Sequence, residues 1–481
     1  MKHFAILFLI LILCNCKPKL QEHVDQQKPN IVLFLVDDLG WTDLKSYGSQ
    51  LYQTLNVDKL VKDGIKFTNA YAASTVCSPT RASIMTGKYP ATINCTDWIS
   101  GHKKPFAKYK VPNWTQHIRD EDKTLAEALK REGYNTIHVG KWHLGEEEKN
   151  WPEHHGFEQN IGGWKKGQPN KVNNQGGYFV PFNNPRLKDG SSGEYLTERL
   201  AKEAANYIKS HKEKPFFLNF WLYNVHTPLQ AKKEKIDKYK ALVNSDKLQS
   251  NPVYAAMVEH MDDALGTVIN QLKSSGIYNN TIIIFASDNG GLTKDKGNPL
   301  TKPTITSNYP LRTGKGDMYE GGVRTPLVIS WPNKITSGIN TDVLAISPDI
   351  FPTIMGLIGE NEGQEDDWDG IDLSEFLFTG IEPARDVLFW HYPHYHTEGA
   401  KPYSAIRKGD WKLIMVYEYN TLELYNLKED IGESNNLVNK YPEKAEELLT
   451  LLNNWKVKVK AQEPQVNKLY SPEKESIWKP N

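Results

Sequence analysis

The sequence is short of cysteine and has no excess of either charge. Its 481 residues include only four cysteines, too few for a disulfide framework in a chain of this length. The 58 basic residues equal the 58 acidic residues, so the formal net charge is zero. No overall electrostatic field therefore attracts nucleic acid, and we expect none as a partner. Internal repeats are absent as well.

The apolar run near the N-terminus is too short to cross a membrane comfortably. It covers residues 4–13 after a basic start, whereas a membrane-spanning helix needs about 20 apolar residues. Such a pattern is typical of a signal peptide. The run ends near Asn15-Cys16, which resembles a bacterial lipoprotein signal with Cys16 as the lipidated residue; plain secretion is the alternative. We therefore expect a lipoprotein-type signal peptide over 1–16 and a linker over 17–28. The protein is then exported to the periplasm or cell surface and contacts the membrane only through a lipid anchor.

Most of the chain alternates apolar strands with amphipathic helices. A chain of this length is expected to form one large domain with a smaller companion. Helical spacing over 193–210 and 252–275, between strand-like runs, favours an α/β fold with a large, mainly parallel sheet sandwiched by helices. Near residue 376 the pattern changes to short strands separated by turns. We predict a main domain over 29–375 and a smaller C-terminal subdomain with an antiparallel sheet over 376–481.

Acidic side chains follow two of the apolar strands at the point where each strand ends. The run 30–36 leads directly into Asp37-Asp38, and the run 281–286 leads into Ser287-Asp288-Asn289. Neighbouring carboxylates at the end of a buried strand repel each other unless something compensates their charge. A divalent cation does so, and oxygen ligands suit Ca²⁺ or Mg²⁺. Because two strands end in this way, a pair of solvated turns is the poorer interpretation.

Basic side chains occupy the same position after two further strands. Lys141 follows the strand-like run 135–139, and His226 follows the run 215–224. In a mainly parallel sheet the carboxyl ends of the strands meet at one edge, where such folds bind ligands. The sequence therefore predicts that the acidic and basic groups form a single site.

A short motif points to the chemistry of this site. Cys77 begins the pentapeptide Cys-Ser-Pro-Thr-Arg, with Thr86-Gly87 a few residues further on. A buried structural cysteine is the alternative reading of Cys77 alone. The pentapeptide resembles the modification signal of the formylglycine sulfatases, in which the cysteine becomes Cα-formylglycine. Other pieces follow in sulfatase order, and the resemblance extends over roughly residues 28–435. These pieces are 140–145 (GKWHLG), His226-Thr227-Pro228, Gly314-Lys315-Gly316 and 320–326 (EGGVRTP).

The resemblance implies a sulfuric ester hydrolase matured by a formylglycine-generating enzyme. It implies one Ca²⁺ per chain, held by Asp37, Asp38, Asp288, Asn289 and the modified Cys77. The remaining catalytic residues implied by the resemblance are Arg81, Lys141, His143, His226 and Lys315. Arg81 stabilises the formylglycine, and Lys141 and Lys315 hold sulfate oxygens. His226 protonates the leaving sugar oxygen, and His143 takes the proton that allows sulfate to leave. Cys95 is left as a free thiol.

The expected substrate is a sulfated polysaccharide or its oligosaccharides, because the chain combines export with 13 tryptophans and 23 tyrosines. An algal glycan is favoured, with ulvan first; carrageenan and a host glycosaminoglycan also fit. The long polar segments 98–120 and 164–192 are predicted to be loops around the pocket mouth. Candidate substrate-binding residues are Trp98, His102, Lys165, Lys166, His394 and His396.

Two alternatives remain open at this point. The first is a phosphonate or phosphodiester hydrolase of the same fold, although only one set of metal-type ligands is evident in the sequence. The second is a glycan-binding lipoprotein that has kept the fold without turnover. The presence of every implied catalytic residue argues against the second alternative.

Overall fold

The computed structural model describes residues 28–244, 247–293, 305–360 and 367–481. The predicted signal peptide, with Cys16, lies outside these residues, as does the predicted linker apart from Lys28. Among the helices of the described residues, none combines the length and the apolar character that a membrane crossing requires.

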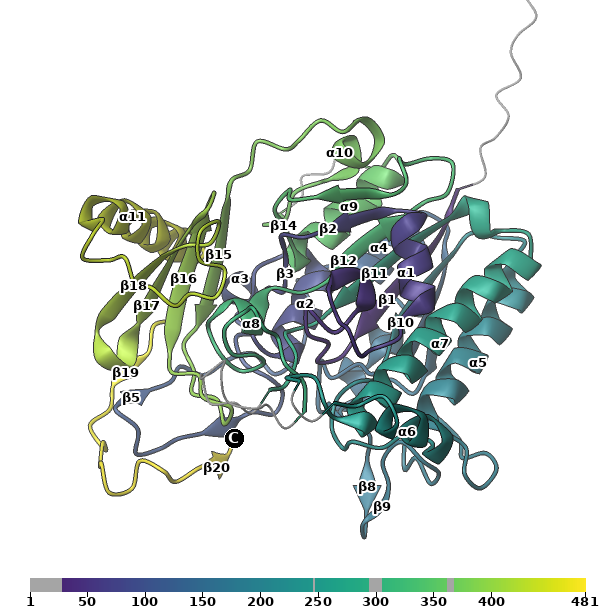
Figure 1. The fold of residues 1–481 in the computed structure, drawn as a ribbon, viewed down its shortest axis with the longest axis horizontal. Coiled ribbons are helices and arrows are strands. Elements are labelled where there is room, and N and C mark those ends of the chain that lie inside the picture. Colours follow the sequence, from purple (N-terminus) through teal and green to yellow (C-terminus); the bar gives the residue numbers. More distant parts are fainter. Residues whose placement is uncertain (1–27, 245–246, 294–304, 361–366) are drawn as a thin grey trace, which may run out of the picture.

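An eight-stranded mixed sheet forms the centre of the larger part of the molecule (Figure 1). Five of its neighbouring strand pairs are parallel, and the two pairs that involve β12 are antiparallel. From one edge to the other, its described strands are β13 (Ile339–Thr341), β2 (Ile65–Phe67), β12 (Leu327–Ser330), β11 (Thr281–Ser287), β1 (Asn30–Val36), β10 (Phe216–Trp221), β6 (Asn135–Gly140) and β7 (Gln159–Ile161). The predicted large, mainly parallel sheet is confirmed.

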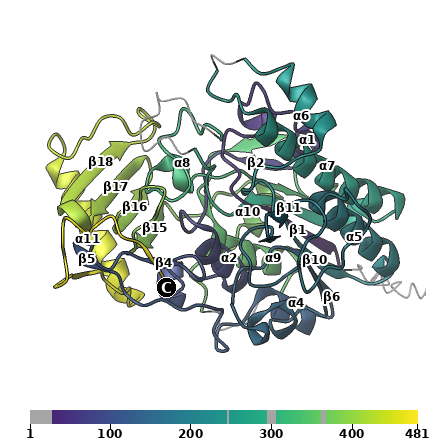
Figure 2. The ribbon, with the colours of Figure 1, turned by 90° about the horizontal axis from the view of Figure 1, so that it is seen from below.

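The central strand β1 is apolar from Ile31 to Val36 because helices cover both faces of the sheet (Figure 2). Val32 and Phe34 point to one face and pack in a core with the first group of helices. This group comprises α1 (Leu55–Lys62), α5 (Leu196–His211) and α7 (Pro252–Ser274). Ile31, Leu33 and Leu35 point to the other face and pack with the second group. That group comprises α2 (Cys77–Thr86), α4 (Leu125–Arg131), α9 (Ile350–Leu357) and α10 (Ser374–Thr379).

The C-terminal part is a separate antiparallel sheet with one long helix, as predicted. Its four strands pair in chain order and are β15 (Val387–Tyr392), β16 (Tyr403–Lys408), β17 (Trp411–Val416) and β18 (Thr421–Asn426). Helix α11 (Pro442–Lys458) packs on this sheet through Leu448 and Leu452. Tyr71 and Tyr319 of the main part belong to the same core, so the two parts share apolar contacts. Helix α10 spans the predicted boundary at residue 376, and its own apolar side chains lie in the main core.

Short elements complete the described structure. The small helices are α3 (Pro90–Ile93), α6 (Lys233–Lys240) and α8 (Glu320–Val323). The two-stranded sheets pair β3 (Ala70–Tyr71) with β14 (Ala345–Ile346), β4 (His102–Lys103) with β20 (Lys479–Pro480), β5 (Tyr109–Lys110) with β19 (Gln465–Val466), and β8 (Lys171–Val172) with β9 (Gln175–Gly176). The segments 98–120 and 164–192, predicted as loops, therefore contain short strands as well.

A buried ionic cluster joins the two parts of the molecule. Lys412 on β17 is fully buried and lies 2.9 Å from the Glu320 carboxylate and 2.8 Å from the Glu433 carboxylate. The Arg324 guanidinium lies 2.7 Å from Glu320, and the Glu320 backbone N–H donates to Glu433 at 2.6 Å. Glu320 lies five residues after Lys315, so the cluster ties the Lys315 segment to the C-terminal sheet.

We expect Lys412→Met to destabilise the protein by about 3–5 kcal/mol, because it leaves two buried carboxylates without their shared cation. The control is Lys408→Met, which removes an exposed pair with Asp386 and should cost less than about 1 kcal/mol. The two variants are compared by thermal and urea unfolding of the full chain. If both variants lose the same free energy of unfolding, the buried cluster does not stabilise the protein more than an exposed ion pair does.

Candidate active site

The strand ends bring three charged side chains together. The parallel pairing of β1 with β11 aligns Val36 with Ser287, which places Asp37 next to Asp288. The pairing of β10 with β6 aligns Trp221 with Gly140, so that Lys141 lies at the same edge of the sheet. Asp37, Asp288 and Lys141 are all completely buried. The structure thus brings these three residues together at one edge of the sheet, as the sequence predicted.

Cys77 is the first residue of helix α2 and is 3% exposed. Its Sγ therefore lies at a helix N-terminus, which favours a negatively charged group. Burial raises the pKa of the Cys77 thiol, although Lys141 and Lys315 act in the opposite direction. Arg81, one turn along the same helix, is completely buried and lies 2.8 Å from the Asp288 carboxylate.

Three cations, the buried Arg81 and Lys141 and the partly buried Lys315, contact the three aspartates. Besides Arg81, Lys141 Nζ lies 2.7 Å from Asp37 Oδ2, and Lys315 Nζ lies 2.8 Å from Asp38. Burial acts against ionisation of Asp38, but Lys315 and the neighbouring cations together hold its pKa below the usual range. For Asp37 burial prevails and raises the pKa, despite the attraction of Lys141.

The acidic group formed by Asp37, Asp38 and Asp288 is suited to bind a divalent metal ion. Ligand atoms of Asp37, Cys77 and Asp288 all lie within 4.8 Å of one another. Asp37 Oδ1 and Asn289 Oδ1 are buried and have no hydrogen-bond partner among the described residues. The Asn289 amide donates to Asp38 Oδ1 at 2.8 Å and to the Gly290 carbonyl, which leaves its oxygen available. Two unpaired oxygen acceptors beside carboxylates are the donor set that a hard cation requires.

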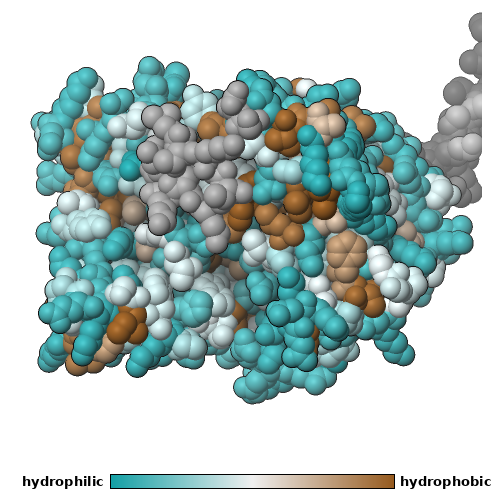
Figure 3. All heavy atoms as spheres, turned by 60° about the horizontal axis from the view of Figure 1, so that its bottom comes forward, coloured by the Kyte–Doolittle hydropathy of each residue, from teal (hydrophilic) through white to brown (hydrophobic). Residues whose placement is uncertain are grey.

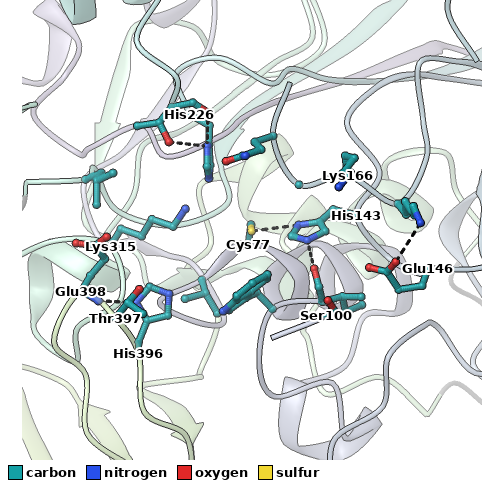
Figure 4. A pocket seen from close by; sticks show the side chains of 18 residues that line it. Cys77, Ser100, His143, Glu146, Lys166, His226, Lys315, His396, Thr397 and Glu398 are labelled. Carbon is teal, nitrogen blue, oxygen red and sulfur yellow. Dashed lines mark hydrogen bonds and ion pairs between the residues drawn. The ribbon is translucent and has the colours of Figure 1, made fainter. Parts of the chain in front are cut away.

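His143 faces Cys77 with a defined nitrogen. Its Nδ1 lies 3.4 Å from Cys77 Sγ, and its Nε2 contacts the carbonyl oxygen of Ile99 (Figure 4). Because a carbonyl only accepts, Nε2 carries the hydrogen and Nδ1 is left as the acceptor toward Cys77. Burial lowers the pKa of His143 well below its usual value, so the ring is neutral. His143 and Asp38 both have a φ of 61°, a strained conformation that is concentrated at functional sites.

His226 approaches the same group from the end of β10. Its Nε2 lies 3.6 Å from Asp38 Oδ2, and its Nδ1 lies 2.8 Å from the Thr227 carbonyl oxygen. Burial, reinforced by Lys315, lowers the pKa of His226 to about 3. The ring is therefore neutral with its hydrogen on Nδ1, and an added proton on Nε2, which faces Asp38, would be strongly acidic.

These groups lie in one pocket of about 390 Å³. Cys77 lies between His143 on one side and Lys315 on the other, and His226 reaches in from above in the view of Figure 4. The described residues that line the pocket are Val76, Cys77, Trp98, Ile99, Ser100, His143, Glu146, Lys165, Lys166, Gly167, Gln168, His226, Thr227, Leu292, Lys315, His396, Thr397 and Glu398.

Comparison with known proteins decides the family. The sulfatase profile matches residues 29–360, and the profile of N-sulphoglucosamine sulphohydrolase, C-terminal, matches residues 314–462. The chain belongs to the sulfatase family. It is therefore a sulfuric ester hydrolase, in a family whose members generally use formylglycine and a divalent metal.

Relatives of this sulfatase come from bacteria and animals. A sulfatase of Formosa agariphila is 31% identical, with 92% of this chain and 90% of the relative covered. Human N-acetylgalactosamine-6-sulfatase is 31% identical, with 76% of this chain and 68% of the relative covered. The crystal structure of Ps i-CgsB in complex with k-i-k-neocarrahexaose has 28% sequence identity and a TM-score of 0.73, covering 89% of this chain and 93% of that one.

The structure sorts the candidate substrate-binding residues of the sulfatase into two groups. Trp98, Lys165, Lys166 and His396 line the pocket. His102 does not line it but packs edge-on against Trp98, with ring centroids 4.8 Å apart.

His394 lies away from the pocket, contrary to its selection as a candidate. It is 1% exposed, and its Nε2 is 2.8 Å from Thr96 Oγ1. Its ring also packs edge-on against Trp114, at a centroid distance of 4.8 Å. The aromatic and polar neighbours of His394 thus draw its side chain into the interior.

Five polar pocket residues lie outside the motifs that the sequence analysis recognised. With Ser100, which the sequence analysis did not select either, they are Glu146, Gln168, Thr397 and Glu398. Glu146 and Gln168 flank recognised residues along the chain, and Glu146 lies 3.6 Å from Lys165 Nζ. Residues 146–148 are three consecutive glutamates, and such a run is common on any surface, so it gave no reason to select Glu146.

Proposed function

We propose that this sulfatase removes sulfate esters from a sulfated polysaccharide or its oligosaccharides through a formylglycine made from Cys77. The observation that carries the proposal is the position of Cys77 Sγ, which lies beside a metal-type acidic group and 3.4 Å from His143 Nδ1. The matured residue supplies a geminal diol, one hydroxyl of which attacks sulfur. A mass spectrum of the Cys77 peptide from the native source tests the modification directly.

The chain's own residues have distinct proposed roles in this reaction. Lys141 and Lys315 hold sulfate oxygens and neutralise charge that develops at sulfur, while Arg81 stabilises the modified residue 77. His143 Nδ1 takes the proton of the second hydroxyl, so that the C–O bond between residue 77 and the bound sulfate breaks, sulfate leaves and the aldehyde is restored. His226 Nε2 gives a proton to the leaving sugar oxygen.

We propose Ca²⁺ as the divalent metal of this site. Asp37, Asp38, Asp288 and Asn289 supply the oxygen ligands, together with the modified residue 77. The cation supplies positive charge next to the sulfate and the nucleophile. One such group of ligands occurs among the described residues, which favours a singly charged sulfate ester over a phosphonate or phosphodiester.

His226→Ala should impair turnover of a sugar sulfate far more than turnover of nitrophenyl sulfate. A sugar alkoxide is a poor leaving group and needs a proton, whereas nitrophenolate leaves without one. The extra loss on the sugar sulfate should be about 10²–10⁴-fold in kcat.

The matched control is Lys315→Ala, which removes a proposed sulfate contact and should impair both substrates similarly. Steady-state kinetics of the two variants on both substrates give the comparison. If His226→Ala lowers both rates equally, the residue binds sulfate and the acid is another group.

The pocket rim supports a glycan rather than a small sulfate ester. Trp98 offers an aromatic surface for a sugar ring, and Lys165 and Lys166 offer positive charge to a carboxylate or second sulfate. Ps i-CgsB was solved with a carrageenan-type hexasaccharide. We propose an algal glycan as substrate, and ulvan, carrageenan and glycosaminoglycan oligosaccharides form the panel for measuring sulfate release.

We further propose that the protein is exported and anchored by a lipid on Cys16. The proposal rests on the N-terminal sequence pattern. Mass spectrometry of the mature N-terminus in the native cell tests it, with Cys16→Ala as the comparison. An unlipidated mature N-terminus would leave plain secretion as the route.

A further inference from the structure

A two-stranded ribbon extends one wall of the pocket. It consists of residues 98–110 and 465–481, and we call it the tail ribbon (Figure 1). Strands β4 and β20 pair within it, as do β5 and β19. The Asn467 side-chain amide donates to the Pro105 and Ala107 carbonyls, and the Asn481 amide donates to the carbonyl of Ser100, a pocket-lining residue.

Aromatic rings run outward along the tail ribbon from the pocket. Trp98 lines the pocket and packs against His102, and His102 packs in turn against Trp478 at a centroid distance of 6.3 Å. Lys104 Nζ lies 5.6 Å from the Trp478 ring and 5.1 Å from the Tyr395 ring. Trp478 is partly exposed, so part of its ring remains available to a ligand.

The tail ribbon is also strongly basic in an otherwise neutral chain. Its two segments contain seven lysines and two glutamates, while the whole chain has zero formal charge. Lys104 is paired with Glu475 at 3.3 Å, which leaves a positive surplus on the ribbon. The face in Figure 3 is hydrophilic with hydrophobic patches, and the ribbon itself also exposes Val466 and Leu469. Aromatic rings within a basic, polar surface are suited to the sugar rings of a polyanion.

We propose that the tail ribbon binds the sugars next to the one whose sulfate is removed. The inference rests on the proposed function and extends it: the substrate is an anionic oligosaccharide or polymer that occupies several sugar positions, with one ring on Trp478. His102 and Lys104 hold the Trp478 ring in place, and the lysines attract the sulfate or carboxylate groups of the chain.

Binding is tested in a Cys77→Ala background, where no sulfate is released. Calorimetry measures the Kd of ulvan, carrageenan and chondroitin sulfate hexasaccharides. In this background, Trp478→Ala should raise the Kd of the hexasaccharide that binds most tightly about tenfold. Trp478→Phe should restore most of the lost affinity. The control is Tyr441→Ala, which removes a 39% exposed ring that packs on Trp411.

Turnover by the mature enzyme provides the second readout. The loss in kcat/KM caused by Trp478→Ala should be about tenfold larger for the hexasaccharide than for nitrophenyl sulfate. Equal losses on both substrates would mean that Trp478 only positions the pocket wall, and would overturn the inference. Failure of all three hexasaccharides to bind Cys77→Ala would also overturn it. If instead hexasaccharides bind but no sulfate ester is hydrolysed by mature enzyme, the proposed function fails while the binding surface stands.

Discussion

Cys77→Ala is expected to abolish sulfate release, with a loss of at least about 10⁴-fold in kcat/KM. The thiol occupies the start of helix α2 at the pocket floor, so alanine removes the nucleophile and leaves the neighbouring charges in place. Alanine lacks only the sulfur atom of the cysteine side chain, and that atom lines a pocket, so the melting temperature should change little. Sulfate release from the best glycan of the panel and thermal unfolding provide the two measurements.

Cys95→Ala is the matched control for this prediction. Cys95 is also buried and has a free thiol, but it packs in an apolar core and does not line the pocket. Its replacement should leave the sulfatase active. Activity of Cys77→Ala within tenfold of the parent would refute the formylglycine proposal, because the pocket would then use another nucleophile.

Removal of divalent cations is expected to inactivate the enzyme, and Ca²⁺ is expected to restore it. Asp37→Asn should raise the Ca²⁺ concentration required for half-maximal activity at least about 10²-fold, since it replaces a charged oxygen ligand by a neutral one. A second readout is the melting temperature, which Ca²⁺ should raise in the parent but far less in the variant.

Asp43→Asn is the control for the metal prediction. Asp43 lies on the same loop and is equally buried, but its carboxylate accepts from Tyr254, Thr306 and the Gly40 N–H. The Ca²⁺ concentration that Asp43→Asn requires for half-maximal activity should match that of the parent. Full activity of the parent in excess chelator would rule out the metal site.

The parts of the fold predicted best are those dictated by local pattern. Strand β1 was predicted residue for residue because it is buried on both faces, and the polar residues after it could be placed at one edge by the rules of parallel sheets. The antiparallel insertion of β12 between β11 and β2 was not predicted. Its position depends on contacts with distant strands, and its own four residues would suit either direction.

Among the candidate substrate-binding residues, too, residue type could be predicted from the sequence but side-chain direction could not. Lys165 and His396 were selected for their residue type and lie in the pocket, whereas His394, two residues earlier, turns into the interior. In an extended strand, residues two apart point to the same side, but β15 ends at Tyr392 and the segment that carries both histidines is irregular, so no periodic pattern predicts their directions. That choice is made by Thr96 and Trp114, which lie nearly 300 residues away in the sequence.

The tail ribbon has a consequence for the order in which the enzyme is assembled. The Asn481 amide and the Ser100 carbonyl that it binds are separated by 381 positions, and Asn467 and Pro105 by 362. During synthesis, the segment that carries Trp98 emerges from the ribosome long before the strands that pair with it. The backbone around Ser100, on one wall of the pocket, therefore gains these partners only after the C-terminal subdomain has been translated.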